Sequence, residues 1–204
     1  MAGLAAVNQV GESLVGLLRA RRDVLAASAL LGPVPPALDI SHVSLSRLAT
    51  ATEPTAGLTI TCYRLAYSDH PTPRVAVRQA ATGATIALEL HYLLAAWPSA
   101  AADEQAIITW AMLELAAHPV LDRSVLLGGP GVWARDETVQ IVPDSLSDDG
   151  LFRVWDALQH KYRLSTTFSA RVVRINYGPP DDWPPVVATR VGLADTDPLT
   201  EGVV

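Results

Sequence analysis

The sequence predicts an α+β domain in which a mostly antiparallel, twisted sheet is flanked by about three helices. In three stretches, apolar residues recur every three or four positions, which is typical of helices with one buried face. Several other stretches alternate apolar and polar residues, which is typical of strands. A chain of 204 residues is also long enough for one domain with a sizeable core.

The first half of the chain is expected to hold one helix and two strands. The helix is predicted from about Ala5 to Arg22, and the glycine and prolines of residues 32–36 then interrupt regular structure. Alternation predicts a strand with a possible bulge over residues 37–48. A cleaner strand is predicted over Leu58–Tyr67, with both of its faces at least partly covered.

The stretch TIALELHYLLAAWPS, residues 85–99, begins as a third strand. It follows a surface excursion predicted over residues 68–83, which lack any strong period. One face of this strand is apolar, whereas Glu89 and His91 share the other face. Side chains two apart on a strand lie roughly 7 Å from each other, so these two are expected to be neighbours.

Two more helices and two more strands are expected in the second half. A helix begins at Asp103 and ends at His118, which caps it before a proline. A short strand over residues 137–142 follows, then a helix that begins at Ser147, and then a long strand over residues 162–177. The residues predicted to be buried on these helices are Ile107, Ile108, Ala111, Met112, Leu115, Leu151, Val154, Trp155 and Leu158.

Composition and charge exclude several classes of partner. The formal net charge of −6 disfavours nucleic acid, which is bound largely through clustered Lys and Arg. The dense basic cluster of Arg19, Arg21 and Arg22 is interpreted as a solvated helix end. Apolar runs stop well short of the roughly 20 residues that span a bilayer, and no export signal is evident, so a cytoplasmic protein is expected.

No cofactor or metal site is predicted. Cys62 is the only cysteine, so it cannot form an internal disulfide or a cysteine-rich zinc site, and it is expected to act as a small core residue. The glycine-rich stretch LLGGPGVWARDE lacks the lysine and hydroxyl residue of a phosphate-binding loop. The five histidines lie in five different contexts, without a metal-binding or nucleophile motif.

The chain is divided into a domain over residues 1–177 and a proline-rich C-terminal arm over residues 178–204. The arm carries five prolines, Trp183 and the short apolar run VVATRV. Prolines keep a chain extended and lower the entropy lost on docking, so the arm is expected to contact a neighbouring chain. A disordered tail is the alternative.

Several stretches of the chain resemble a known family. They are IALELHYLLAAW, LELAAHPVLDR and VQIVPDSLSDDGLFRVWDALQHKYRLSTTFSARVVRI, and the resemblance runs from about Leu4 to Ile175. The family comprises the tail-terminator, or cap, proteins of extracellular contractile injection systems, formerly a domain-of-unknown-function family. The alanine-rich first loop, Gly150 and the proline-rich tail depart from its usual pattern.

The resemblance implies a phage tail-terminator-like fold, a structural protein and no enzyme. It implies a homohexameric ring at the distal end of the inner tube, which ends tube growth and holds the last layer of sheath. Such a protein would be assembled in the cytoplasm and become part of a contractile particle. A terminator or accessory of an ordinary contractile phage tail is an alternative, as is, in a different class, a small hydrolase using Glu89 and His91. The residues predicted to form interfaces are Glu89, His91, Arg171, Arg174 and Trp183.

Overall fold

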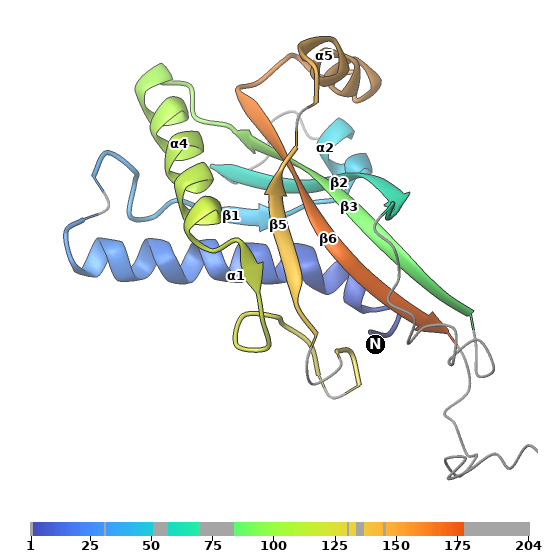
Figure 1. Ribbon diagram of the computed structural model, residues 1–204. Helices are drawn as coiled ribbons and strands as arrows, with labels where there is room; N and C mark the ends of the chain where they lie inside the picture. The colour runs from blue at the N-terminus through green and yellow to red at the C-terminus, as the bar shows by residue number, and fades with distance from the viewer. Residues whose placement is uncertain are drawn as a thin grey trace, which may run out of the picture.

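The computed structural model describes most of the chain, namely residues 2–30, 32–50, 57–69, 84–129, 131–133, 137–144 and 146–177. Within these residues, six strands form one sheet in the order β1-β2-β3-β6-β5-β4 (Figure 1). All strand pairs are antiparallel except β1 with β2. The elements are α1 (Ala6–Ala27), β1 (Ile40–His42), α2 (Leu45–Thr50), β2 (Leu58–Tyr67), β3 (Ala84–Ala96), α4 (Ala101–Ala117), β4 (Val120–Leu121), β5 (Val139–Pro143), α5 (Asp148–Ala157) and β6 (Ser165–Tyr177).

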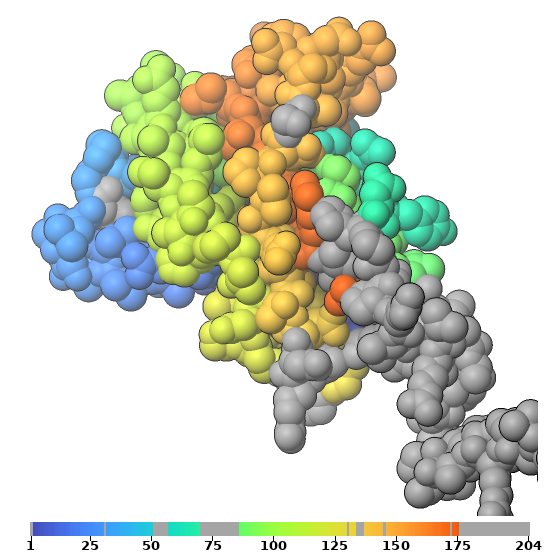
Figure 2. All heavy atoms as spheres, in the orientation of Figure 1, coloured from blue at the N-terminus to red at the C-terminus, as the bar shows by residue number. Residues whose placement is uncertain are grey.

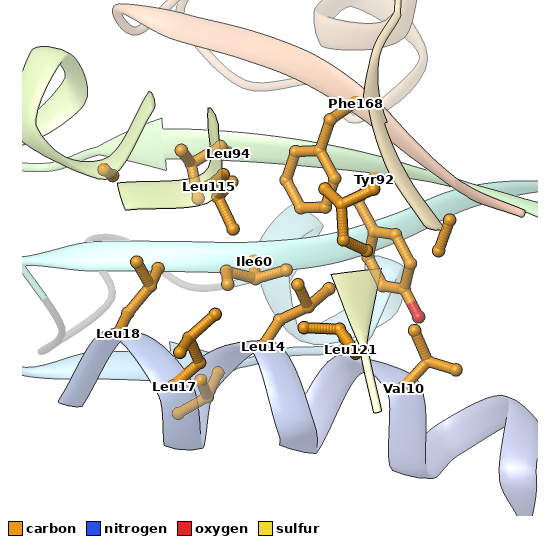
Figure 3. Close-up of a cluster of buried hydrophobic side chains, with 14 of the residues drawn as sticks. Val10, Leu14, Leu17, Leu18, Ile60, Tyr92, Leu94, Leu115, Leu121 and Phe168 are labelled. Atoms are coloured by element: carbon orange, nitrogen blue, oxygen red, sulfur yellow. The ribbon is translucent and has the colours of Figure 1, made fainter. Parts of the chain in front are cut away.

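The two faces of the sheet carry separate hydrophobic cores. The larger core lies on the face covered by α1 and α4, where Tyr92 of β3 stacks on Phe168 of β6 with ring centroids 5.4 Å apart. Figure 3 shows leucines of α1 pointing at this face of the sheet. The smaller core lies on the other face, where α2 and α5 bring Leu48 and Trp155 against Leu93 of β3. We call the first the α1 face and the second the α5 face.

The α+β class and the mostly antiparallel sheet are confirmed. Apolar spacing predicted the three long helices because each has one stripe that must be buried, and alternation predicted the three long strands. The two caps are confirmed as well. Ser147 Oγ accepts the Gly150 N–H at 3.2 Å, and His118 Nδ1 lies 2.8 Å from the carbonyl oxygen of Glu114, the last-turn residue that it caps.

The strand predicted over residues 37–48 is wrong in its second half. Only Ile40–His42 pair with β2, and a fourth helix, α2, follows. Ser44 begins this helix, because its hydroxyl accepts the Arg47 N–H and its carbonyl accepts the Leu48 N–H at 3.0 Å. The predicted shift of one position in the apolar pattern therefore marks a helix start instead of a bulge.

The interpretation of the arginine cluster as a solvated helix end is also wrong. Helix α1 continues past it to Ala27, and the three side chains bind other elements. Arg19 and Arg22 donate to the carbonyl oxygens of Ile40 and Leu38, beside β1. Arg21 Nε lies 2.8 Å from Glu114 Oε2 of α4. The cluster thus connects α1 to its two neighbours on the α1 face.

Three apolar side chains lie further from the core than predicted. Met112 on α4 is half exposed, although it was expected in the buried stripe. Leu65 and Tyr67, at the end of β2, are 57% and 76% exposed, so the second half of this strand is poorly covered. The reason is that the described cover lies over the first part of β2. Leu58 and Ile60 pack in the larger core with α1, and Tyr63 packs against the smaller core that contains Leu48 of α2.

Two predicted segments lie mainly or wholly outside the described residues. They are most of the excursion at residues 68–83, and the arm at residues 178–204 with Trp183. The boundary after Tyr177 therefore stays a prediction.

Candidate interface site

A row of polar side chains follows β3 and β6 on the α5 face, at the point where the cover of α5 ends. On this face of β3, Leu93 is buried under α5. Towards the start of the strand, the next two side chains on the same face are His91 and Glu89. Beyond the last β2 pair, Tyr67 with Leu88, the strands β3 and β6 continue as a short two-stranded ribbon in which residues 84–87 pair with residues 174–177 (Figure 1). The polar row lies just before this ribbon, where His91 and Glu89 still pair with Arg64 and Ala66 of β2.

Glu89 forms an ion pair with Arg171 of β6, with 3.0 Å between Glu89 Oε1 and Arg171 Nε. The pair sits at a bulge, since Leu88 and Leu90 pair with Val173 and Ala170, so two residues of β6 oppose Glu89 alone. The Glu89 side chain is 16% exposed and the Arg171 side chain 28%. Burial of this kind reduces solvent screening, and the ion pair holds the bulge in place.

His91 is connected to Asp144, the residue after β5, with 2.8 Å between His91 Nδ1 and Asp144 Oδ2. The same oxygen accepts the hydroxyl of Tyr63 on β2 at 3.1 Å. Burial, and then the negative charge of Asp144, raise the pKa of Tyr63 well above its usual value of 10, so the phenol remains a donor. Asp144 therefore connects the chain after β5 with β2 and β3.

The arrangement contains elements of a hydrolytic site but does not complete one. Ser169 lies directly opposite His91 on β6, and Asp144 would orient the imidazole. However, Ser169 is 1% exposed, and its hydroxyl accepts the Arg171 Nε–H at 3.3 Å. Glu89 is paired with Arg171 instead of His91. A substrate could not reach the hydroxyl in this geometry, so the polar groups act on each other and stiffen the sheet.

The two remaining predicted interface residues are not part of this row. Arg174 is half-buried on the ribbon, and its carbonyl oxygen accepts the Ala2 N–H at 2.9 Å, which brings the start of the chain to β6. Trp183 lies outside the described residues. Asp144 and Tyr63 escaped the sequence reasoning because each contacts His91 from a distant part of the chain. No local spacing could have identified them.

An apolar groove of about 570 Å³ lies between α4, which covers the α1 face, and the strands β5 and β6. Met112 and Leu113 of α4 form one wall, and Ile141 and Phe168 contribute to the other. In Figure 2, α4 (yellow-green) stands beside the orange surface of β5, and the groove lies where the two meet. Leu113 is 65% exposed there.

The described residues offer no group of three or more His, Cys, Asp or Glu side chains that could hold a metal ion. Within the same residues, each helix falls short of the length and apolar character that a bilayer-crossing segment needs. Cys62 is half-buried on β2, and burial raises the pKa of its thiol.

The fold is that of tail terminators. The chain is similar to the sheath/tube terminator of an extracellular contractile injection system, PVC, solved in the extended state, with a TM-score of 0.50 and 19% identity. It is also similar to the tube-terminating cap of the anti-feeding prophage, with a TM-score of 0.50 and 16% identity. These matches cover 94% and 84% of this chain, but 64% and 60% of the two solved chains.

The chain belongs to the Pvc16 N-terminal domain family, whose model matches residues 9–189. None of the curated proteins matches it significantly. The family and the two structures confirm the resemblance drawn from the sequence, and neither supports the hydrolase alternative. The match also extends beyond Tyr177, into the first part of the predicted arm.

Proposed function

We propose that this chain is a structural cap that ends the tube and sheath of an extracellular contractile injection system. The observation that carries the proposal is that one fold, shared with two terminators, accounts for nearly the whole chain. Membership in the Pvc16 N-terminal domain family supports it independently. The chain spans about 60–64% of the length of those two terminators, so it would supply the part of a terminator that they share with it.

The proposed partners are the tube protein, the sheath protein and further copies of this chain. A terminator must bind the end of a tube without offering the same end again, and a closed ring built from one repeated contact achieves this. Six chains of 21.7 kDa would give a ring of about 130 kDa. Such a ring would assemble in the cytoplasm and remain in the finished particle.

Polar contacts between strands of the sheet support this role. Asp144 and Arg171 connect side chains on neighbouring strands, so the polar row on the α5 face would hold its shape under the load of a contracting sheath. A cap needs fixed geometry more than it needs a reactive site. In this row Glu89 is paired with Arg171, and Asp144 is hydrogen-bonded to His91 and Tyr63.

Imaging of particles from cells that lack this chain tests the proposed function. Loss of the cap should give tubes of irregular length without an end layer, and supply of the chain in trans should restore uniform length. Capped tubes of uniform length in its absence would refute the assignment. If the chain were instead the terminator of an ordinary phage tail, the same cells should show phage heads and tails that fail to join correctly.

Purified protein provides a second test, by sedimentation alone and after addition of tube fragments. A species of about 130 kDa, or decoration of tube ends, is expected from closure of the ring. Protein that stays monomeric under both conditions and leaves tube ends bare would contradict the ring.

A further inference from the structure

The outer edge of β2 is open over its second half in the part of the chain that the structure describes. β1 covers this edge only as far as Ile60, whose partner is His42. No described strand pairs with the outer edge from Cys62 to Tyr67. An uncovered edge of this kind presents backbone donors and acceptors to any strand that can add to it.

Hydrogen bonds on either side show which backbone groups of β2 point outward. The N–H of Leu58 and the carbonyl of Ile60 bond to the β1 side. After the bulge between Cys62 and Arg64, the N–H of Ser68 bonds inward, to Ala87 of β3 at 2.9 Å. Alternation along the strand therefore directs the N–H and C=O groups of Leu65 and Tyr67 outward.

The side chains beside this edge are apolar and exposed. Leu65 and Tyr67 lie opposite Leu90 and Leu88, so they project from the α1 face. They are 57% and 76% exposed, and Ile86 on the same face is 38% exposed. Figure 1 shows this end of β2 (teal) at the margin of the sheet, away from α1 and α4. Contiguous apolar exposure next to an open edge is typical of a surface that binds another strand.

The chain contains a segment suited to this edge. Residues 186–191, VVATRV, include four β-branched side chains and are bounded by Pro185 and Gly192. Val187, Thr189 and Val191 would share one face of a strand. Six residues in a strand span about 20 Å, the same length as the open edge from Cys62 to Tyr67.

We infer that residues 186–191 of one copy add as a strand to the outer edge of β2 in a neighbouring copy. The inference rests on the proposed ring and specifies its repeated contact. Strand β6 runs in the same direction as β2 and ends at Tyr177, so docking on its own β2 would need a reversal within eight residues, four of which are proline. Proline-rich connections are semi-rigid and extended, which favours a neighbour. In such a contact the arm of one copy meets the β2 edge of the next, so two different surfaces of the chain are joined. Heterologous contacts of this type can close a ring.

Disulfide formation between two differently tagged copies tests the contact. Both copies carry Cys62→Ser, which removes the only natural cysteine. One copy carries Tyr67→Cys and the other carries Val187→Cys, Thr189→Cys or Val191→Cys in turn, because the register is open. Paired strand positions lie within the Cα distance that a disulfide requires, so at least one of the three mixtures should give a cross-linked pair of the two tagged chains.

The matched control places the cysteine at Leu113, which is 65% exposed against 76% for Tyr67 but lies in the apolar groove on α4. We expect no cross-link from Leu113→Cys. Cross-linking at Leu113 in place of Tyr67 would overturn the inference, because the segment would then bind the groove. A third preparation carries both cysteines in one chain. A cross-link that forms only within that chain, and never between the two tagged copies, would also overturn the inference, since the contact would not join two copies.

A proline scan tests the role of the backbone. Leu65→Pro removes an outward N–H and leaves the ladder to β3 intact, so it should weaken self-association about tenfold with little change in melting temperature. Leu65→Thr keeps the N–H and should associate nearly as the unmodified chain does. Tyr67→Pro, at the strand end, repeats the test if Leu65→Pro lowers the melting temperature. Equal association of the proline and threonine variants would contradict strand addition.

These outcomes separate the inference from the proposed function. If the unmodified chain forms rings or binds tube ends but gives no cross-link at Tyr67, only the inference fails. If it neither self-associates nor binds tube ends, the proposed cap fails, and the inference fails with it.

Discussion

Trp155→Ala is the substitution expected to damage the fold most on the α5 face. The indole is 1% exposed and forms the centre of the smaller core, where its ring centroid lies 6.2 Å from that of Trp97. Its Nε1–H donates to Ser165 Oγ at 3.0 Å, at the start of β6. The substitution would therefore remove the largest side chain that packs α5 on the sheet, together with a hydrogen bond to β6.

The magnitude follows from the buried area. A buried indole removes about 150–250 Å² from water, which at about 25 cal/mol per Å² corresponds to roughly 4–6 kcal/mol as an upper value. Truncations of this type in other proteins cost about 3–5 kcal/mol. We expect a loss of about 3–5 kcal/mol in the free energy of unfolding, a large part of the 5–15 kcal/mol that holds a typical domain together.

Denaturant titration followed by far-UV circular dichroism measures this loss. Phe152→Ala is the control on the same helix, because Phe152 is 52% exposed and should cost less than about 1 kcal/mol. Trp155→Phe keeps an aromatic ring but loses the bond to Ser165, so it should fall between the two. A loss below about 1 kcal/mol for Trp155→Ala, or one equal to that of Phe152→Ala, would show that α5 does not depend on this core.

Four further predictions concern the larger core, the titration of buried phenols, helix α1 and the arm. The Tyr92 hydroxyl is buried without a hydrogen-bond partner among the described residues, so thermal melting should show Tyr92→Phe to be as stable as the unmodified chain or more so. Burial raises the pKa of both Tyr63 and Tyr92 in the folded state, so the phenols of the unfolded chain ionise first as pH rises. The free energy of unfolding should therefore fall as pH rises above about 10. Tyr63→Phe should make this fall less steep when stability is measured between pH 8 and 11. Gly11→Ala would place a Cβ 2.5 Å from the His42 ring, so chemical denaturation should show a loss of about 1–3 kcal/mol despite the better helix propensity of alanine. Truncation after Tyr177 should leave the melting curve largely unchanged and reduce ring formation or binding to sheath in a pull-down, whereas a collapsed melting curve would place the arm in the core.

The sequence by itself determined the elements whose signal is local. Helix α1 and the strands β2 and β3 are recognisable because a buried stripe or face imposes a fixed spacing on apolar residues. The caps at Ser147 and His118 are local too, since each binds a group within four residues of itself. The resemblance to tail terminators also depended on such stretches of contiguous sequence.

Only the tertiary structure decided features that depend on partners far along the chain. Helix α2 is six residues long, too short to be stable alone, and exists because Leu48 is buried against the α5 face. The polar row also depends on distant partners. Glu89 and His91 are neighbours on β3, but Arg171 comes from β6 and Asp144 from the chain just after β5.

The open edge of β2 likewise follows from where β1 ends, because the alternation within β2 is the same whether or not a neighbour covers it. Local spacing records which side chains must be buried, whereas pairing, charge neutralisation and exposed edges depend on which distant segments the folded chain brings together.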